Sequence, residues 1–399
     1  MVKIAMWQKP QLRLDEEENK HRKVGWLELF FDLFFVVVFA QIAHHLGQDI
    51  SVNGVFEFTL FFVPAWWVWV TDTYHKERFE TEGLENRVYT FAMMVAITGM
   101  AVSAGHGLTV SFTGYASAYL FARFMTTLMW IRGGIHHPEF RPVAKRITIG
   151  FAATAAAIIG SFFMTGNQSL LLFCIGVVVD LLGPFSLVKF LKNLPKYSSS
   201  KLPERFGLLT IIVLGETIVG VVNGLAKHQQ VSFMTFVGGV IGLAIVFCLW
   251  WIYFDFIGRR VFKPVPPWPF IWSYLHLPLS MGIIASGPGI LKGLTYIDAV
   301  LPREVGYFLA GTVALSLFSV SLLETTLARD ADEHSHPIAS PSLKIAGALG
   351  VLAMPYFYPS LDSIKLLLFF LVILAVQVIY ASYVCFAPDA QEHNNSAFT

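Results

Sequence analysis

Two acidic residues stand at the start of an apolar segment that is long enough to cross a membrane. Glu28 and Asp32 lie four residues apart in WLELFFDLFFVV (26–37), so a helix would place them one turn apart on the same face. Glu28 suits the first turn, where the positive end of the helix dipole stabilises a carboxylate. Asp32 lies beyond that turn, and its chemistry would be the binding of a cation or a proton.

A third acid is predicted to meet these two. Asp72 ends the apolar segment 54–74, and because segment 26–46 enters the membrane where segment 54–74 leaves it, Asp32 and Asp72 should face each other. Two buried carboxylates repel unless a cation or a shared proton lies between them. The sequence therefore predicts that Glu28, Asp32 and Asp72 line a cavity that takes up a cation or a proton.

The alternative needs no bound ion. Basic residues of loops such as Arg78 or Arg87 would neutralise the three acids, and the cluster would then only tie helices together.

Three more ionisable residues lie near the middle of predicted membrane spans: Arg123, Asp180 and Glu216. Arginine keeps its charge, so Arg123 needs a buried acid, and we predict that Asp180 or Glu216 supplies it. The pair is either a static structural contact or a substrate or proton site at the depth where transporters bind solutes. Gly215 precedes Glu216, and Gly220 and Gly224 follow it; glycines at such positions favour close approach of another helix.

His276 lies two residues before Pro278 within another predicted span. It is either a member of a proton relay or a buried histidine whose hydrogen bonds are satisfied locally.

The sequence contains no signature of an enzyme. We find no nucleophile elbow, P-loop or zinc-protease pattern, and the three cysteines have no metal-ligand spacing. We therefore expect no catalytic residue, no cofactor and no metal site. A formal net charge of +1 gives no indication of a nucleic-acid partner.

The composition predicts a helical membrane protein. Of the 399 residues, 55% are hydrophobic and 14% are charged, whereas a soluble domain carries about 25% charged residues. Mean hydropathy is +0.61. We expect an all-α polytopic bundle in a lipid bilayer, because segments of about 20 apolar residues can cross its core. Twelve such segments are predicted: 26–46, 54–74, 88–107, 112–131, 147–165, 168–191, 206–225, 232–257, 269–291, 304–328, 343–359 and 363–386.

Basic residues set the predicted orientation. Lysine and arginine gather in the first 25 residues and in every second connection after them, and cytoplasmic loops carry that excess. Both termini are therefore predicted to be cytoplasmic.

The two halves of the chain share three motifs in the same order, which predicts two parallel six-helix repeats. The matched segments are 28–42 with 204–218, 67–72 with 250–255, and 102–107 with 284–289. The second pair of segments aligns Asp72 with Asp255, each at the end of a span. The predicted divisions are a cytoplasmic tail (1–25), a first repeat (26–191), a cytoplasmic linker (192–203), a second repeat (204–386) and a cytoplasmic tail (387–399).

Several of these strings resemble the bacterial low temperature requirement A family. They are GWLELFFDLFFVVVFAQIAHHL (25–46), WWVWVTDTY (66–74), Arg123 on the fourth span, and ERFGLLTIIVLGETI (204–218). The resemblance covers most of the chain. It implies a multi-pass protein of the inner membrane, named for a cold-growth phenotype, and it supplies no reaction.

The first span is also distantly similar to a family of bacterial and lysosomal potassium channels with two six-span repeats. Phe30 and Asp32 match the Phe and Asp of that family's Arg-x-x-x-Phe-Ser-Asp motif, but Trp26 replaces the Arg and Phe31 the Ser. In the second half, Leu208 stands where the Asp would be.

The buried charges favour a transporter or channel for a small solute or cation, with proton coupling as one option. The alternative is a membrane-embedded sensor or assembly factor for cold or membrane stress. Whether the chain forms a homo-oligomer is left open by the sequence.

Overall fold

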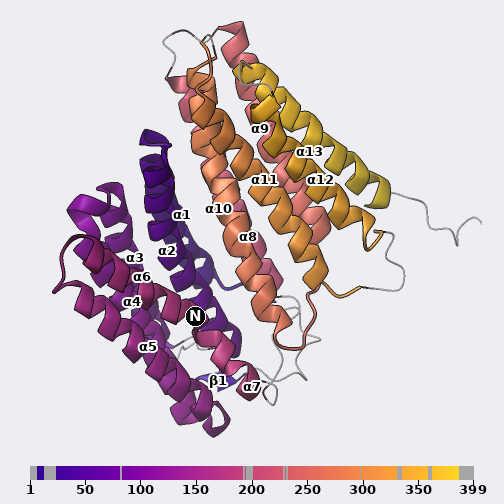
Figure 1. Ribbon diagram of the computed structural model, residues 1–399. Coiled ribbons are helices and arrows are strands. Elements are labelled where there is room, and N and C mark those ends of the chain that lie inside the picture. The colour runs from indigo at the N-terminus through magenta and orange to yellow at the C-terminus, as the bar shows by residue number, and fades with distance from the viewer. Residues whose placement is uncertain are drawn as a thin grey trace, which may run out of the picture. The chain divides into compact units, whose positions relative to one another are not determined.

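In the computed structural model, long helices occupy the predicted spans (Figure 1). The structure describes residues 7–12, 24–80, 83–191, 194, 201–227, 230, 232–297, 299–329, 335–357 and 362–385. The predicted tail 387–399 and most of the predicted linker and N-terminal tail lie outside these ranges. The long helices are α1 (Trp26–Gln48), α2 (Val52–Arg78), α3 (Leu84–Gly105), α4 (Leu108–His136), α5 (Arg141–Ser161), α6 (Gly166–Leu182), α8 (Lys201–Ala226), α9 (Phe233–Tyr253), α10 (Trp268–Thr295), α11 (Arg303–Thr326), α12 (Ala339–Phe357) and α13 (Ser363–Cys385).

Shorter elements complete the described chain. Two residues of backbone pair antiparallel between β1 and β2, with Leu12 opposite Phe79, a contact that the sequence did not predict. The short elements are β1 (Gln11–Leu12), β2 (Phe79–Glu80), the 3-10 helices η2 (Pro138–Phe140) and η3 (Gly183–Leu187), α7 (Val188–Leu191) and the π-helical turn η4 (Phe254–Gly258).

The all-α polytopic class is confirmed. Ten helical segments in the described residues are long and apolar enough to cross a membrane. Helices α4 and α12 cover predicted spans but are not among those ten. Both carry charge in their interior, Arg123 in α4 and Lys344 in α12, and each of these residues is buried. Their crossing of the membrane stays a prediction.

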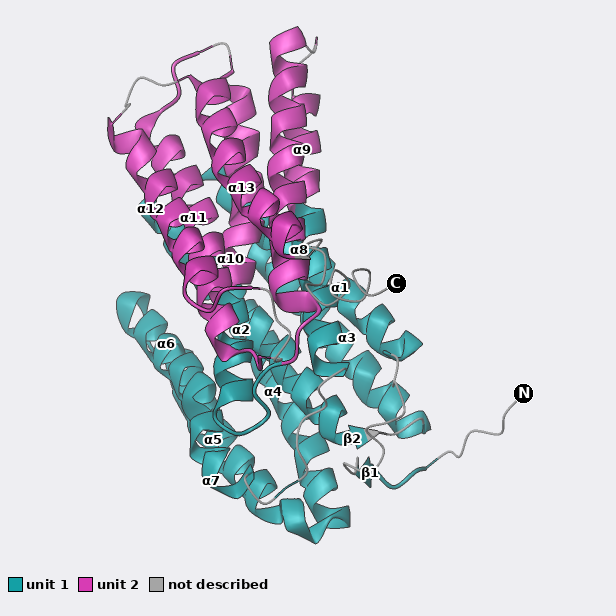
Figure 2. Ribbon diagram, turned by 90° about the vertical axis from the view of Figure 1, so that its right-hand side faces the viewer, with its two compact units in different colours: residues 1–216, 262–277 teal, residues 217–261, 278–399 magenta. Residues whose placement is uncertain are grey.

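The chain folds into two compact units, and the three boundaries between them fall inside α8, between η4 and α10, and inside α10 (Figure 2). Unit 1 comprises residues 1–216 and 262–277, and unit 2 comprises residues 217–261 and 278–399. The two units do not coincide with the predicted repeats (26–191 and 204–386). The internal repeat stays a prediction.

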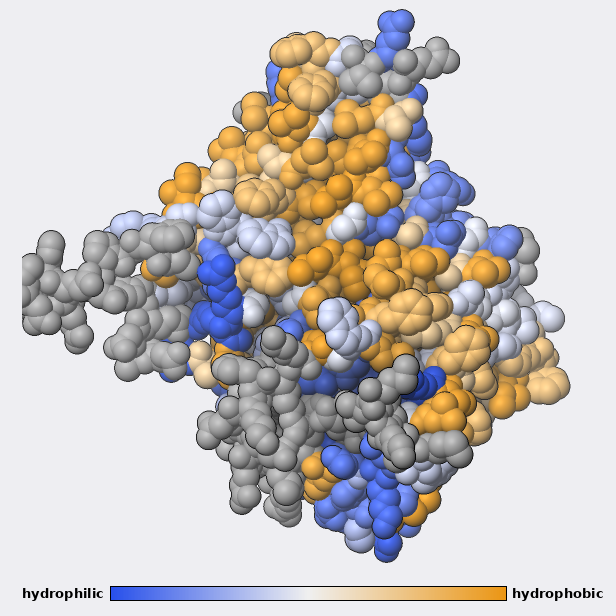
Figure 3. Space-filling model, turned by 180° about the vertical axis from the view of Figure 1, so that it is seen from behind, coloured by the Kyte–Doolittle hydropathy of each residue, from blue (hydrophilic) through white to orange (hydrophobic). Residues whose placement is uncertain are grey.

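In unit 1, α1 packs against α2 and α3, α4 packs against α2, α3 and α5, and α5 packs against α6. The start of α10 joins this unit, because the hydroxyl groups of Tyr74 on α2 and Ser273 lie 2.7 Å apart. On α4 the charged side chain of Arg123 is 4% exposed, whereas Phe121 and Phe124 beside it are 42% and 44% exposed. A lipid-facing helix should divide in this way, with apolar side chains outward and charge inward. Broad apolar areas are visible on the face shown in Figure 3.

In unit 2, α12 packs against α11 and α13, and α13 packs against α9. Lys344 on α12 is fully buried; its ammonium lies 3.3 Å from a Glu324 oxygen and 3.3 Å from the centroid of the Phe256 ring. The acid and the aromatic ring together replace the hydration that this charge would lose inside a membrane.

The prediction that the glycines around Glu216 allow close packing is confirmed for Gly220 and Gly224, where an added Cβ would lie within 3 Å of α10, and is wrong for Gly215. A Cβ built on Gly220 would lie 2.8 Å from the backbone of Gly287 on α10, so only glycine permits this approach. By contrast, a Cβ on Gly215 would meet no atom within 4 Å among the described residues.

We expect Gly220→Ala to lower the melting temperature of the purified protein, because α8 and α10 must separate to admit the methyl group. Gly215→Ala, five residues earlier in open space, is the control and should leave the melting temperature unchanged. Equal melting temperatures for the two variants would contradict the close approach.

Candidate functional site

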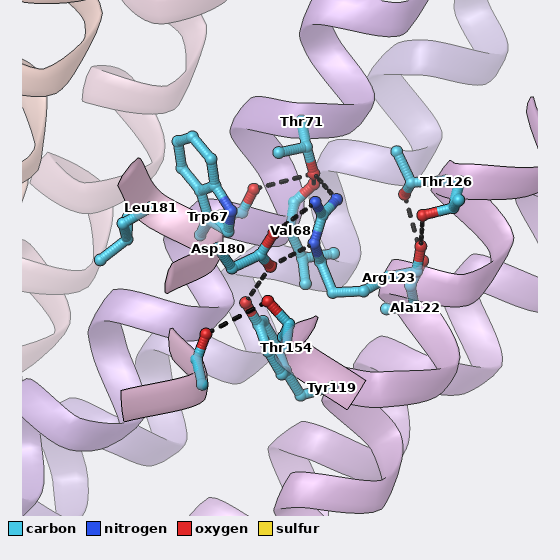
Figure 4. Close-up of polar contacts among 12 residues, drawn as sticks. Trp67, Val68, Thr71, Tyr119, Ala122, Arg123, Thr126, Thr154, Asp180 and Leu181 are labelled. Carbon is cyan, nitrogen blue, oxygen red and sulfur yellow. Dashed lines mark hydrogen bonds and ion pairs between the residues drawn. The ribbon is translucent and has the colours of Figure 1, made fainter. Parts of the chain in front are cut away.

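A buried ion pair joins the middle of α4 to the C-terminal end of α6 (Figure 4). The Arg123 guanidinium donates from Nε to Asp180 Oδ2 over 2.5 Å and from Nη2 to Asp180 Oδ1 over 2.8 Å. Both residues are at most 5% exposed. The contact is bidentate, the geometry in which a guanidinium and a carboxylate bind most strongly. Of the two acids that the sequence offered to Arg123, the structure selects Asp180.

Two hydroxyl groups complete the pair. Arg123 Nη1 donates to Thr71 Oγ1 on α2 over 2.8 Å, and the Tyr119 hydroxyl donates to Asp180 Oδ2 over 2.5 Å. The Thr71 hydroxyl in turn donates to the backbone oxygen of Trp67. Three helices are thus connected through one arginine, and the Asp180 carboxylate accepts three hydrogen bonds.

This network forms part of the wall of a cavity in unit 1. The cavity encloses about 680 Å³, its open mouth included, and most of its lining is apolar or aromatic. Arg123, Asp180 and Thr71 contribute the polar wall, and the exposed side chain of Arg146 on α5 also lines it. The other lining residues are Trp67, Tyr74, Trp130, Val143, Ile147, Gly150, Phe151, Val179, Gly183, Pro184, Leu187, Leu191 and Phe270. A mostly apolar lining with a few polar groups is the character of a small-molecule site.

The acids of α1 face basic residues of α8. Lys201 Nζ lies 2.9 Å from Glu28 Oε1, and Arg205 Nη2 lies 2.7 Å from Asp32 Oδ1. Trp69 Nε1 also donates to Asp32 Oδ1, over 2.9 Å. Since each helix carries its two charges four residues apart, the contacts form a ladder of two rungs, which we call the α1–α8 ladder.

Glu28 also marks the start of α1, as predicted. The backbone nitrogen of Gly25, the residue before the helix, lies 3.4 Å from Glu28 Oε2. The carboxylate therefore serves both the first turn of α1 and the first rung of the ladder.

Asp72 has its own partner within α2. Its carboxylate lies 2.8 Å from the Lys76 ammonium, which also lies 4.2 Å from the centroid of the Phe31 ring on α1. Asp72 is fully buried. The positive charge expected between the acids thus comes from lysine and arginine side chains of the chain itself.

The structure changes two details of the predicted acid cluster. The acids contact Lys76 and the two basic residues of the ladder, which were not among the suggested partners. The cavity found in unit 1 is lined by Arg123 and Asp180, with none of Glu28, Asp32 and Asp72 among its lining residues. Binding of a cation or a proton by those three acids stays a prediction.

Asp255, the predicted counterpart of Asp72, lies in the π-helical turn η4 of unit 2. Its carboxylate accepts a hydrogen bond from Trp251 Nε1 over 2.6 Å and lies 3.7 Å from Arg259 Nη1. Asp255 and Asp72 therefore each contact a basic residue four positions later in the chain.

The two remaining candidates lie apart from the cavity lining. Glu216, on α8, is half-buried, and no ion pair joins it to Arg123. His276 is buried; its ring donates from Nδ1 to the Trp272 backbone oxygen over 2.8 Å and packs against the rings of Trp272 and Phe206. These contacts match the locally satisfied histidine; a proton-relay role stays untested.

Sequence reasoning missed Lys201 and Arg205, because it counted them among the basic residues of a connecting loop. Helix α8 begins at Lys201, five residues before the predicted span, and both side chains are buried. One signal could have found them: their four-residue spacing equals that of Glu28 and Asp32, and the charges are opposite.

Comparisons with known proteins agree over most of the chain. Residues 23–379 match the family model described as bacterial low temperature requirement A protein. The chain is similar to an uncharacterized protein of Rhizobium meliloti (strain 1021), with 29% identity over 297 residues, covering 69% of this chain and 71% of that protein. No solved structure was found to match.

Proposed function

Since the chain belongs to the bacterial low temperature requirement A family, whose name gives no reaction, we propose a function from the cavity. The protein carries a small solute across the membrane. The observation that supports this proposal is the position of the Arg123–Asp180 pair. A pair that only tied helices together would be enclosed by packed side chains, whereas Arg123 and Asp180 both line a mostly apolar cavity.

The position along the helices fits such a role. Arg123 lies midway along α4, and Asp180 lies midway along the apolar segment Gly166–Leu191, which begins with α6. Transporters bind their solutes near the middle of the membrane. The pair is neutral as a whole and rich in hydrogen bonds, so a solute can exchange contacts with it without leaving a bare charge in the membrane. We place the chain in the inner membrane with both termini in the cytoplasm, as the basic connections predict, and we assign it no enzymatic activity.

The test blocks the cavity without touching its charges. Gly150 lines the cavity, and a Cβ built there meets no described atom within 4 Å, so Gly150→Leu would fill the space and leave the fold intact. In proteoliposomes screened for flux of K⁺, Na⁺, H⁺ and small organic solutes, we expect the wild type to move at least one of them. Gly150→Leu should abolish that flux.

The control is the same substitution at Gly293 on α10, which also has open space around its Cβ and lies outside the cavity lining. Gly293→Leu should transport like the wild type. If the wild type moves none of the screened solutes, or if Gly150→Leu transports as well as Gly293→Leu, the proposal is wrong, and the sensor or assembly factor becomes the better explanation.

A further inference from the structure

The polar groups of the cavity differ in how much hydrogen-bonding capacity they have left. The Asp180 carboxylate already accepts from Arg123 twice and from Tyr119 once. The Thr71 hydroxyl accepts from Arg123 and donates to the backbone of Trp67. The strongest acceptor of the cavity is therefore largely occupied.

Two hydrogen-bond donors in the same lining, by contrast, have no acceptor in the described part of the chain. Trp67 is 1% exposed, and its buried indole nitrogen has no hydrogen-bond partner among the described residues. A buried donor without an acceptor is unfavourable, so a ligand that supplies the acceptor is bound more tightly.

Arg146 is the second donor. Its guanidinium lies 5.1 Å from the centroid of the Phe190 ring, and the structure pairs it with no acid in the described part of the chain. Because Arg123 and Asp180 cancel, the lining carries a net charge of one positive unit, which comes from Arg146. An anion is the ligand that this charge favours.

The rest of the lining selects the body of the ligand. Trp67, Trp130, Phe151 and Phe270 present aromatic rings, and Val143 and Ile147 add aliphatic surface. Such a wall binds an apolar or aromatic group by burying its surface, and it offers little to a hydrated inorganic ion.

We infer that the cavity binds an amphiphilic monoanion, an apolar or aromatic body with one acidic group that accepts hydrogen bonds from Trp67 and Arg146. This inference rests on the proposed function for its physiological meaning, but its binding chemistry can be measured separately. The acidic group can belong to a soluble carboxylic acid or to an anionic lipid, and the two sources share this chemistry.

The test measures binding by calorimetric titration of the purified full chain in phosphatidylcholine nanodiscs, with empty nanodiscs as the blank. The probes are 4-phenylbutyrate and its neutral amide, 4-phenylbutyramide, which have the same body. We expect saturable binding of the anion and roughly tenfold weaker binding of the amide, the ratio expected for loss of a charge-assisted hydrogen bond.

Two variants test the assigned residues against matched neighbours. Arg146→Gln and Trp67→Phe should each weaken binding of 4-phenylbutyrate by roughly tenfold. Arg146→Gln should change binding of the amide less, because the amide carries no charge, whereas Trp67→Phe should weaken it as well, because the amide oxygen also accepts from the indole. Their controls are Lys145→Gln, an exposed neighbour outside the lining, and Trp66→Phe, a buried neighbour outside it. Both controls should bind the anion like the wild type.

Three results would overturn the inference: no saturable binding of 4-phenylbutyrate, equal binding of anion and amide, or no difference between the two variants and their controls.

Nanodiscs that contain equal parts of phosphatidylglycerol and phosphatidylcholine distinguish an anionic lipid from a soluble acid as the source of the acidic group. Weaker binding of 4-phenylbutyrate there supports an anionic lipid as the occupant, and unchanged binding supports a soluble acid. Saturable binding without any flux would overturn the proposed transport and leave this inference standing.

Discussion

Asp180→Asn is expected to lower the free energy of unfolding by about 3–5 kcal/mol, the usual cost of removing one partner from a buried ion pair. The asparagine keeps the size of the side chain but removes the negative charge that faces Nε and Nη2 of Arg123. The arginine then stays charged in a site that is 4% exposed. Equilibrium unfolding of the purified protein in detergent measures the change.

The exposed pair of Asp362 and Lys365 is the matched control. Its atoms are 2.7 Å apart, close to the spacing in the buried pair, but its side chains are 43% and 70% exposed. Asp362→Asn should therefore cost between about 0 and 1 kcal/mol. Similar losses for the two aspartate variants would mean that water or another group compensates Arg123, and the pair would lose its assigned role.

Arg205→Gln is expected to produce the second large effect, again about 3–5 kcal/mol, because Asp32 would keep only the Trp69 indole as a partner in the ladder. Combining Arg205→Gln with Asp32→Asn should recover part of the loss, since no bare charge is then left between α1 and α8. Unfolding of the single and double variants under the same conditions gives the coupling energy of the rung.

The first rung offers a stricter check by charge exchange. Glu28→Lys and Lys201→Glu should each destabilise the protein, and the two together should restore most of the stability, since the 2.9 Å contact is then re-formed with reversed charges. Additive losses in the double variant would contradict direct pairing of these residues.

Much of the fold could be predicted from the sequence because the membrane requires long apolar segments. Each predicted span, including 26–46 and 206–225, coincides with a helix in the described residues. Boundaries were less accurate, since a span prediction stops at charged residues whereas a helix continues through them. Helix α8 shows this most clearly, because its first turn contains Lys201 and precedes the apolar run.

The site was predictable only in part. A permanently charged arginine within a span must have an acidic partner, and this requirement narrowed the partner of Arg123 to Asp180 or Glu216. The cavity beside the pair depends on the shapes of side chains from helices far apart in sequence, such as Gly150 and Phe270, and no local pattern encodes it. The predicted meeting of Asp32 and Asp72 considered only the acids, so it left out the basic partners of α8.

The α1–α8 ladder also constrains how the chain is made. Its rungs join residues 173 positions apart. At a synthesis rate of about 5–20 residues per second, α1 waits roughly 9–35 s before its basic partners leave the ribosome. During that time two carboxylates at the mouth of the first span lack the side chains that later neutralise them. A chain cut before Lys201 would never supply the basic partners of Glu28 and Asp32. The charges of α1 are therefore neutralised only at a late stage of biosynthesis.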